Sequence, residues 1–397
     1  MNPYNIQINR TNSNAEKYTL REKLFGTKDI IPMWVADMDI ATPRFIFDEI
    51  EKRIKHKILG YEEFPIKAKN AQIKWMKRNH NYKIKPENIL YSHSVVTSIS
   101  LAIRAFAKKN EEVIVQTPVY SPFYRSISNN KRKIIKNPLK LDEKGDYTFD
   151  FEDLESKITK KTKLLILCSP HNPVGRVWTK VELTRLANIC LKHDIKIFSD
   201  EIHSDLVYKK FKHTPIASIN KEIENITITA LGVGKTFNLA GVSTSTVVIT
   251  NQKMQKRFKQ VYHAFHLADG NVFGHTSFIS AYKKGQEWRD GLMNHLQENI
   301  NKLEKMLQNH KDKIVFKKPQ GTYLVWLDCK QMHLNDEELH KFFIKEAKLG
   351  LSPGVSFGEE GTGYMRLNIA VTSAQMQIAI NRINKALKNW DIKKKKS

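Results

Sequence analysis

The stretch Gly232-Val233-Gly234-Lys235-Thr236-Phe237-Asn238 places one lysine in a loop of small residues. Residues 225–230 before it alternate between polar and apolar types, as a β-strand does, and residues 246–249 after it predict a second strand. Burial between two strands would penalise the lysine ammonium and lower its pKa. A lysine in that state is an amine nucleophile that forms a Schiff base with a carbonyl compound. An exposed lysine in a glycine-rich turn is the alternative that this loop leaves open by itself.

The length and composition of the chain predict a protein of two domains in the cytoplasm. Its 397 residues, 41% of them hydrophobic, are enough for a large core. Residues 1–10 are polar and lack the apolar run of a signal peptide, and no stretch is long and apolar enough to span a bilayer. Cys168, Cys190 and Cys329 are spaced neither as metal ligands nor as a disulfide framework. We therefore expect buried thiols in a reducing compartment, with no membrane segment and no metal.

The formal net charge of +25 raises the question of a nucleic-acid partner. The lysines are scattered along the chain, mostly on the polar faces of predicted helices, and the only dense run is 393–396. Neither interleaved aromatic and basic residues nor zinc-finger spacing accompanies them. We therefore expect a solvated basic surface with weak affinity for polyanions, and no specific nucleic-acid partner.

Short apolar segments alternate with helical segments before and around the lysine loop. Predicted strands lie at 89–91, 113–115, 133–135, 164–167 and 196–198, followed by the two strands that flank Lys235. Apolar strands that alternate with helices are typical of a mostly parallel sheet covered on both faces. Right-handed crossovers would place the carboxyl end of every strand at one edge of that sheet. We therefore predict an α/β fold.

The pattern changes near residue 285, which predicts a domain boundary. A long helix over 288–310 precedes short strands and two further helices, the pattern of a smaller α+β unit. Near the other end of the chain, the hydroxyl of Thr42 is expected to cap a helix that continues through Ile54. The predicted domains are an N-terminal arm at 1–44 that contributes to the small domain, a large domain at 45–285, a small C-terminal domain at 286–390, and a disordered basic tail at 391–397.

Polar residues follow the predicted strands of the large domain at their carboxyl ends. The sequence SPHNPVG at 169–175 follows one strand, SDEIH at 199–203 follows the next, and Lys235 follows a third. Open parallel sheets hold their ligands at this edge. The amide of Asn172, the carboxylate of Asp200 and the amine of Lys235 are therefore expected to converge, although they lie far apart in sequence.

These motifs, in this order, resemble those of the pyridoxal 5′-phosphate (PLP) enzymes of the aspartate aminotransferase fold, fold type I. Further stretches resemble its MalY/PatB-type cystathionine β-lyase branch, namely MWVADMD at 33–39, TPVYSPFY at 117–124, KTFNLAG at 235–241, QGTYLVWLD at 320–328 and PGVSFGEEGTGYMRLN at 353–368. The resemblance covers most of the chain. It implies a mostly parallel central sheet with a smaller α+β domain, PLP as cofactor, and cleavage of a carbon–sulfur bond.

The resemblance implies a role for each residue around the PLP ring. Lys235 would bind PLP as a Schiff base and then remove the substrate Cα proton. Asp200 would keep the pyridine nitrogen protonated, so that the ring accepts the electrons of the carbanion; a strand-end cap is the alternative. Asn172 would donate to the 3′ oxygen of the cofactor, with a plain Asn-Pro turn as the alternative. Tyr120 would stack on the ring, with core packing as the alternative. His203 would tune the 3′ oxygen, or be a packed histidine at the strand end.

The phosphate of PLP is expected at the N-terminus of a helix. Ser94 and the backbone N–H groups of Val95 and Val96 would hold it, and a simple serine cap is the alternative. Tyr61 resembles the tyrosine that reaches the phosphate from the neighbouring subunit in this fold, which implies a homodimer. A buried aromatic residue after Gly60 is the alternative for this tyrosine.

The resemblance also implies the residues that bind the substrate. Arg366, which stands in an apolar strand, would bind the substrate carboxylate with two hydrogen bonds; a structural carboxylate is the competing partner. Ala36 and Asp37 resemble the N-terminal segment that closes over the substrate, and Asn172 would face the substrate as well as the cofactor.

The sequence departs from the family pattern where the phosphate is held. Related enzymes carry one or two hydroxyl residues just before the lysine, but here those places are Gly232 and Gly234. Glycine allows close approach of the backbone and offers no side-chain donor. The affinity for the cofactor would then be lower, or another residue, for instance Ser243 or Thr244, would supply the missing hydroxyl. Val174 replaces a further hydroxyl residue, the threonine of the HNPTG-like turn.

The reaction that the resemblance implies is α,β-elimination of cystathionine or another S-substituted cysteine to a thiol, pyruvate and ammonia. A class I/II aminotransferase, which would share every cofactor contact, is the alternative. A nucleic-acid-binding regulator built on the same fold is a third hypothesis, suggested only by the charge of the chain.

Overall fold

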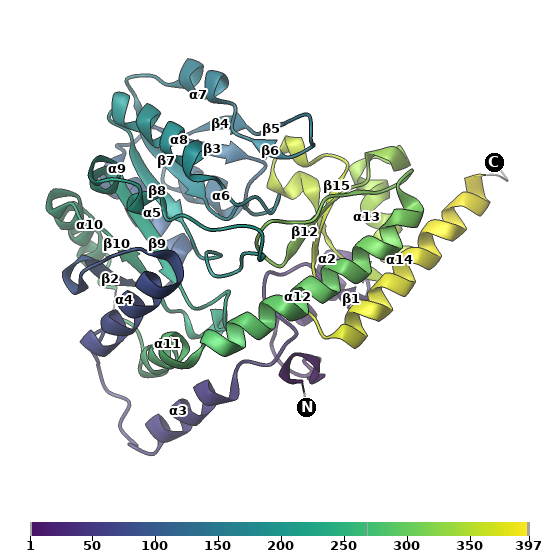
Figure 1. The fold of residues 1–397 in the computed structure, drawn as a ribbon, viewed down its shortest axis with the longest axis horizontal. Coiled ribbons are helices and arrows are strands. Elements are labelled where there is room, and N and C mark those ends of the chain that lie inside the picture. Colours follow the sequence, from purple (N-terminus) through teal and green to yellow (C-terminus); the bar gives the residue numbers. More distant parts are fainter. Residues whose placement is uncertain (1, 268, 395–397) are drawn as a thin grey trace. The chain divides into compact units, whose positions relative to one another are not determined.

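The computed structural model describes residues 2–267 and 269–394, which form two compact units (Figure 1). The small unit comprises Met1–Ala41, Pro173–Gly175 and Gly291–Ser397, and the large unit comprises Thr42–Asn172 and Arg176–Asp290. These units come from the structure, and the domain bounds predicted from the sequence stay a separate prediction.

A seven-stranded sheet in the order β2-β10-β9-β8-β7-β3-β4 lies at the centre of the large unit. Neighbouring strands from β9 to β4 pair in parallel, whereas β10 pairs antiparallel with both β2 and β9. The α/β fold with a mostly parallel sheet is therefore confirmed. The strands are β2 (Ile89–Ser92), β3 (Glu112–Thr117), β4 (Lys133–Pro138), β7 (Thr162–Cys168), β8 (Lys196–Asp200), β9 (Thr227–Gly232) and β10 (Ser245–Val248).

The direction of β10 corrects one prediction. Ser245 at its start pairs with Ser92 at the end of β2 and with Gly232 at the end of β9. The expectation that every strand presents its carboxyl end to one edge is therefore wrong for β10, which presents its amino end. The chain returns from β9 to β10 without the crossover helix that a parallel pairing requires. Both ends of the loop that carries Lys235 consequently lie at the same edge.

Apolar side chains bury the sheet of the large unit on both faces. Val113, Leu164 and Ile228 belong to one hydrophobic cluster with residues of α5 and α10. Their chain neighbours Ile114 and Leu165 point to the opposite face, because strand side chains alternate, and are buried as well. The helices of this unit are α3 (Arg44–Ile54), α4 (Ile66–His80), α5 (Val95–Phe106), α6 (Pro122–Asn129), α7 (Phe151–Lys157), α8 (Lys180–Lys192), α9 (Lys221–Ile226), α10 (Gln252–Ala264) and α11 (Val272–Lys284), with a short pair of strands, β5 (Lys140–Leu141) and β6 (Tyr147–Thr148).

Helix α3 begins differently from the prediction. Its N-cap residue is Pro43, and no side chain caps it. The hydroxyl of Thr42 instead donates a hydrogen bond of 3.1 Å to the backbone oxygen of Asn238. The predicted capping role of Thr42 is therefore wrong, and this hydroxyl fastens the segment that follows Lys235.

The small unit contains a four-stranded antiparallel sheet in the order β11-β12-β15-β14. The N-terminal arm joins this unit through β1, which pairs in parallel with β13. Helix α12 (Gln286–Leu307) crosses the bound between the units. The other elements are α1 (Glu16–Thr19), α2 (Arg21–Phe25), β1 (Ile31–Pro32), β11 (Val315–Phe316), β12 (Leu324–Asp328), α13 (Asp336–Lys345), β13 (Leu349–Gly350), β14 (Ser352–Pro353), β15 (Tyr364–Asn368) and α14 (Ser373–Lys394).

The turn Pro173–Gly175 belongs to the small unit, although the prediction places it in the large domain. Gly175 has a φ of 73°, and a Cβ there would lie 2.6 Å from that of Pro319. Its backbone oxygen accepts the N–H groups of Gln320 at 2.8 Å and Gly321 at 3.0 Å. At the other end of the chain, α14 includes residues 391–394 of the predicted tail, and 395–397 lie outside the described residues.

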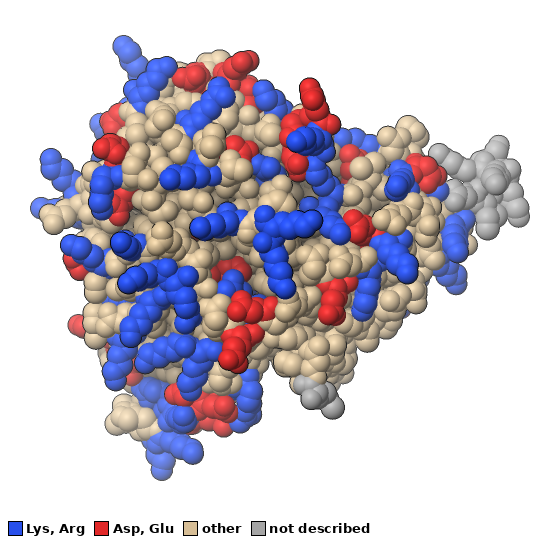
Figure 2. All heavy atoms as spheres, viewed as in Figure 1, with Lys and Arg blue, Asp and Glu red and all other residues tan. Residues whose placement is uncertain are grey.

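Cys168, Cys190 and Cys329 all lie within the described residues, where they are buried and form no disulfide. Burial raises the pKa of each thiol, so the prediction of buried thiols is confirmed. No helix of the described ranges is long and apolar enough to cross a membrane. Figure 2 shows Lys and Arg side chains spread over one face and interspersed with Asp and Glu, as expected for a solvated basic surface.

Candidate active site

The predicted cofactor residues of the large unit follow the carboxyl ends of neighbouring strands. The register pairs Cys168 with Asp200 and Asp200 with Ala230, which aligns the ends of β7, β8 and β9. The residues gathered at this edge are Ser94 after β2, Tyr120 after β3, Asn172 after β7, Asp200 and His203 at the end of β8, and Lys235 after β9.

Asp200 is a buried carboxylate whose pKa is affected by the charge of Lys235. Among the described residues, the hydrogen bond to this carboxylate comes from the Ile202 N–H, which lies 3.1 Å from Oδ1. Burial raises the pKa of Asp200 to about 7, the charge of Glu201 adds to this, and the Ile202 N–H and the positive charge of Lys235 oppose it. Lys235 is partly exposed. The amine and the carboxylate therefore act on each other at one site.

Removal of the Asp200 charge is expected to stabilise the cofactor-free protein at high pH. The pKa rises from 3.8 to about 7 on folding, so folding takes up a proton between these values and stability falls as the pH rises through this window. The free energy of unfolding of Asp200→Asn should exceed that of the parent protein by a few kcal/mol at pH 8. This difference should vanish below about pH 4. Urea unfolding of the cofactor-free proteins measures this difference.

The matched control for this measurement is Asp194→Asn, which removes an exposed carboxylate paired with Lys196. It should show no gain at pH 8, because its charge is not buried. A stability difference between Asp200→Asn and the parent protein that stays constant from pH 4 to pH 8 would contradict the prediction.

The N-terminus of α5 is the predicted phosphate site. Ser94 is its N-cap, and its hydroxyl accepts the N–H of Thr97 at 3.1 Å, so Ser94 is a helix cap as the alternative holds. The first N–H groups of a helix lack partners within the helix. Val95 and Val96 supply such groups, which suit an anion in addition to the cap.

The remaining cofactor residues of the large unit are partly or wholly buried. The backbone N–H of Asn172 donates to the Sγ of Cys168 at 3.3 Å, and its side chain is buried. Tyr120 is half-buried, and its ring meets that of Phe123 edge-on with 6.2 Å between the centroids. His203 is buried after β8. Tyr120 therefore combines core packing with an open side.

The two glycines before Lys235 differ in the space around them. A Cβ on Gly232 would lie 2.9 Å from Ile202 Cδ1 and 3.1 Å from Ser245 Cβ. On Gly234 the nearest atom would be the Cα of Ala240 at 3.6 Å, an ordinary contact. A side chain on Gly232 would therefore displace Ile202 and crowd Ser245, whereas Gly234 has room for one.

We expect Gly234→Ser to strengthen PLP binding. It restores the hydroxyl that related enzymes carry next to the lysine, and a hydrogen bond to a charged group should raise the affinity roughly tenfold. Gly232→Ser should lose stability, because its Cβ would lie 3.1 Å from that of Ser245 on the paired strand and would push Ile202 aside. Equilibrium titration of the cofactor-free proteins with PLP measures the affinity, with Gly234→Ala as the control that adds a Cβ alone, and urea unfolding measures the stability of Gly232→Ser. Equal affinities of Gly234→Ser and Gly234→Ala would contradict the prediction.

One of the predicted substitute donors is already engaged. The hydroxyl of Thr244 donates to the backbone oxygen of Val242 at 3.1 Å. Ser243 has a φ of 49°, and its backbone oxygen accepts the hydroxyl of Tyr91 at 2.8 Å. A role of Ser243 or Thr244 at the phosphate stays a prediction.

Arg366 and Ala36 lie in the small unit, where hydrogen bonds fix both. Arg366 on β15 is buried, and its Nη2 donates to the backbone oxygen of Trp34 at 2.7 Å and to the hydroxyl of Ser352 at 3.2 Å. The hydroxyl of Tyr323 donates to the backbone oxygen of Ala36 at 2.8 Å. The guanidinium and the segment before Asp37 are thus held together within this unit.

The Asp37 side chain belongs to an ionic cluster in the small unit. Its Oδ2 lies 2.6 Å from Arg10, and its Oδ1 lies 3.2 Å from Lys17. Both cations also pair with Asp39, and the Lys17 side chain is fully buried. Burial would raise the pKa of Asp37, but the charges and hydrogen bonds of the two cations lower it. The carboxylate of Asp37 therefore fastens the N-terminal arm, and its role over the substrate stays a prediction.

Tyr61 is fully exposed in the segment between α3 and α4. The alternative of a buried aromatic residue is therefore wrong. Ile58 and Leu59 of the same segment and Ile66 at the start of α4 are exposed as well. These three side chains and Tyr61 are named the apolar strip.

The sequence reasoning missed Asp205, a buried carboxylate behind the Lys235 loop. Its carboxylate accepts hydrogen bonds from Trp75, His80 and Thr236. The signals that were available are the aspartate two residues after SDEIH and the hydroxyl residue directly after Lys235.

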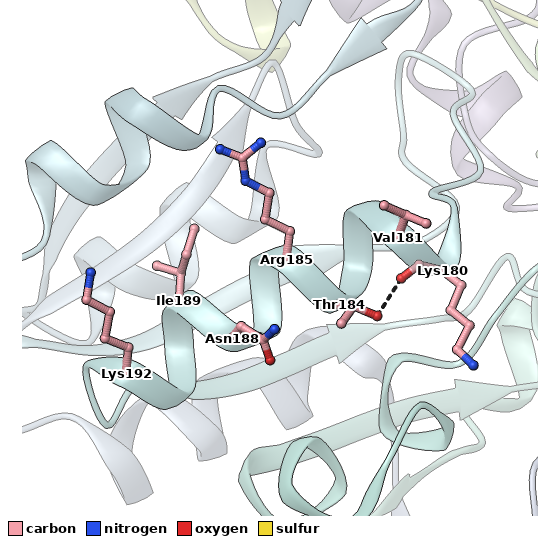
Figure 3. A pocket seen from close by; sticks show the side chains of 7 residues that line it. All are labelled: Lys180, Val181, Thr184, Arg185, Asn188, Ile189 and Lys192. Carbon is pink, nitrogen blue, oxygen red and sulfur yellow. Dashed lines mark hydrogen bonds between the residues drawn. The ribbon is translucent and has the colours of Figure 1, made fainter.

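A surface hollow of about 570 Å³ lies elsewhere, on the outer side of α8. None of its lining residues is one of the predicted site residues, and they follow a single helix (Figure 3). They are Lys180, Val181, Thr184, Arg185, Asn188, Ile189 and Lys192.

A lysine, a buried carboxylate and a helix N-terminus at one edge of a mostly parallel sheet define an enzyme class built to hold a phosphorylated aldehyde. The comparisons name the family. Residues 29–383 match the model for aminotransferase class I and II, so the chain belongs to this family. It is 40% identical over 379 residues to cystathionine beta-lyase PatB of Bacillus subtilis (strain 168), and this match covers 95% of this chain and 98% of that relative.

Two solved structures are similar over almost their whole length. Cystalysin from Treponema denticola, which contains a pyridoxal 5′-phosphate cofactor, has a TM-score of 0.94 and 33% identity, covering 98% of this chain and 99% of that one. The PLP-bound C–S lyase from Staphylococcus hominis has a TM-score of 0.88 and 31% identity, covering 97% and 98%. The predicted resemblance to PLP enzymes of fold type I and to the PatB branch is confirmed.

The residues at the sheet edge fit PLP. The Asp200 carboxylate is buried and receives one hydrogen bond from the described residues, which leaves an acceptor for a protonated ring nitrogen. Lys235 supplies the amine for the aldehyde, and the N-terminus of α5 suits the phosphate.

Proposed function

We propose that this protein is a PLP-dependent carbon–sulfur β-lyase that cleaves cystathionine or a related S-substituted cysteine. The observation that carries the proposal is the electrostatic effect of Lys235 on buried Asp200 at one sheet edge, in a chain 40% identical to a cystathionine beta-lyase. In the overall reaction the Cα–H and Cβ–S bonds break and the sulfur leaves as a thiol. Water then converts the remaining enamine to pyruvate and ammonia.

PLP, when bound, supplies an electron sink for the negative charge at the substrate Cα. In the proposed mechanism, the amine of Lys235 would hold the cofactor, and its Nζ would accept the proton from the substrate Cα. Asp200 holds the charge of the ring nitrogen, and Asn172 donates its amide to the 3′ oxygen. Tyr120 covers the ring, and the N-terminus of α5 at Ser94 binds the phosphate.

The proposed substrate contacts come from the small unit. The Arg366 guanidinium binds the substrate carboxylate through charge-assisted hydrogen bonds. The backbone of Ala36, held by Tyr323, and the adjoining Asp37 form the segment that covers the substrate. In the large unit, His203 tunes the 3′ oxygen, and Val95 and Val96 add their N–H groups at the phosphate.

The test is turnover of the PLP-loaded protein with L-cystathionine and with a series of other S-substituted cysteines. Pyruvate and free thiol should form in equal amounts from at least one of them, and Lys235→Ala should form neither. If no compound of the series yields pyruvate and thiol, the proposal fails.

The aminotransferase alternative is supported by the family to which residues 29–383 belong. An aminotransferase returns the proton to the cofactor carbon instead of expelling the thiol. Stoichiometric conversion of PLP to its amine form, with keto acid formed and no thiol released, would favour this alternative.

We also propose a homodimer in which Tyr61 reaches the phosphate site of the partner subunit. The support is the full exposure of Tyr61 within an apolar strip that includes Ile58, Leu59 and Ile66. Exposed apolar strips of this kind mark interaction surfaces, and a second copy of the chain is the proposed occupant.

Leu59→Glu is expected to convert this dimer to a monomer, because it places a charge in the apolar strip. Association should weaken by at least about tenfold, and PLP affinity should fall with it. Sedimentation velocity of the PLP-loaded protein measures the mass. The matched control is Val181→Glu, at an exposed valine of α8, which should leave the dimer intact. A monomeric parent protein, or equal masses of the two variants, would argue against the dimer.

The proposed compartment is the cytoplasm. All three cysteines, which the structure describes, are buried and unpaired, and cytosolic thiols stay reduced. The proposed ligands are small molecules, namely PLP and an amino-acid thioether. The dispersed basic surface supports no specific nucleic-acid partner.

A further inference from the structure

A buried carboxylate that the proposed chemistry does not use lies against the lysine loop, residues 233–239. The side chain of Asp205 is almost wholly buried. Its Oδ1 accepts the Nε1–H of Trp75 and meets the Nε2 of His80, each at 2.8 Å. Its Oδ2 accepts the hydroxyl of Thr236 at 3.1 Å. Donors from α4 and from the lysine loop therefore converge on one carboxylate.

The surroundings of Asp205 favour its ionised form. Burial alone would raise the pKa of Asp205, but the hydrogen bond and charge of His80, the Trp75 N–H and the charge of Arg289 outweigh burial and lower it. Hydrogen bonds to an ionised acceptor are roughly twice as strong as neutral ones. Removing a hydrogen-bond donor from a buried carboxylate also costs free energy. The hydroxyl of Thr236 is consequently held in one orientation.

Thr236 follows Lys235 directly, so this hydrogen bond acts on the peptide that carries the amine. A β-branched side chain has few χ1 states, and a fixed hydroxyl therefore fixes the backbone next to it. The next residue, Phe237, is held as well, because its ring lies 5.7 Å from that of Trp75 and 5.7 Å from that of Trp288. Trp75 thus contacts Phe237 and donates to the carboxylate that holds Thr236.

The residues before Lys235 restrain its backbone less than the residues after it do. Gly232 and Gly234 have no side chains and leave the backbone permissive. We propose that Asp205 is a positioning residue for Lys235, whose carboxylate acts through the Thr236 hydroxyl to hold the amine in its reactive orientation. This inference rests on the proposed function of Lys235, and it names a residue that touches neither cofactor nor substrate.

The decisive variant is Thr236→Val, which removes the hydroxyl and keeps the β-branched shape. Thr236→Ser keeps the hydroxyl and should restore the behaviour of the parent protein. The matched control is Thr227→Val at the other end of β9. The hydroxyl of Thr227 is buried and donates to the backbone oxygen of Ile223 at 2.7 Å. The control variant therefore loses a comparable hydrogen bond at a position away from the lysine.

The measurement uses the full chain from which PLP has been removed. The first readout is the rate at which PLP becomes covalently bound, trapped with borohydride and located at Lys235 by peptide mass spectrometry. The second readout is the affinity for pyridoxamine 5′-phosphate, which has no aldehyde and needs no reactive lysine. Misplacement of a reacting group by about 1 Å costs up to about a hundredfold in rate. We therefore expect Thr236→Val to slow the capture of PLP by roughly ten- to a hundredfold.

The affinity of Thr236→Val for pyridoxamine 5′-phosphate should stay that of the parent protein, and Thr227→Val should match the parent protein in both readouts. Asp205→Asn should slow capture as well, and the double variant with Thr236→Val should be no slower than Asp205→Asn alone, because both changes break one path.

Two results overturn the inference while the proposed function stands. One is capture by Thr236→Val at the rate of Thr227→Val, and the other is a loss of capture matched by an equal loss of pyridoxamine 5′-phosphate affinity, which would mark a collapsed pocket. A parent protein that captures no PLP at Lys235 refutes the proposed function, and the inference with it.

Discussion

Lys235→Ala is expected to abolish covalent attachment of PLP and to lower turnover of S-substituted cysteines by roughly four orders of magnitude. The substitution removes the amine that binds the cofactor aldehyde and the base that accepts the Cα proton, so two functions disappear with one side chain. Its fold should persist, because Lys235 is partly exposed and its loop is held by Thr42, Asp205 and the aromatic rings around Phe237.

The measurement combines the visible absorption spectrum of the PLP-loaded protein with pyruvate release. The band of the covalently bound cofactor should be present in the parent protein and absent in Lys235→Ala. The matched control is Lys256→Ala, at an exposed lysine of α10, which should keep both band and turnover. A Lys235→Ala protein that retains the band would show that another amine binds PLP.

Asp200→Asn is expected to lower turnover by roughly a hundred- to a thousandfold. An amide has the size of the carboxylate and no charge, so it no longer favours a protonated ring nitrogen. The same variant should stabilise the cofactor-free fold at pH 8, because it removes a buried charge whose pKa is raised to about 7. A loss of activity together with a gain of stability would identify Asp200 as a residue retained for function at the expense of the fold.

Steady-state turnover at saturating PLP and urea unfolding of the same preparations test this pair of effects. Asp194→Asn, on the surface, should change neither quantity. Turnover of Asp200→Asn within a few-fold of the parent protein would show that the ring nitrogen needs no charged partner in this chain.

The sequence was sufficient to predict which residues stand at the carboxyl ends of neighbouring strands, and their roles at a cofactor stay predictions. Asn172, Asp200 and Lys235 each follow a buried apolar segment, and parallel strands bring their carboxyl ends together whatever their separation along the chain. The N-terminus of α5 was predictable for a similar reason, since Ser94 precedes a run of helical periodicity. These are local patterns, and a parallel sheet converts them into a site.

Other features depend on contacts between distant residues, which local patterns do not report. The residue pattern that predicts a strand over 246–249 is the same for a parallel and an antiparallel strand, so the direction of β10 is given only by its pairing with Ser92 and Gly232. Thr42 stands where a helix cap is expected, but its hydroxyl donates to a backbone oxygen of the lysine loop instead. Two of the donors of Asp205, Trp75 and His80, lie on α4, far from it in sequence, and nothing in their spacing indicates a shared acceptor.

The deep burial of Cys168, Cys190 and Cys329 makes the folded chain inert toward thiol-specific reagents at neutral pH, since such reagents attack thiolates. Gly241 lies exposed between β9 and β10, and a Cβ there would meet no atom within 4 Å. Gly241→Cys would therefore provide a single attachment point for a fluorophore six residues after Lys235, with every natural cysteine left in place.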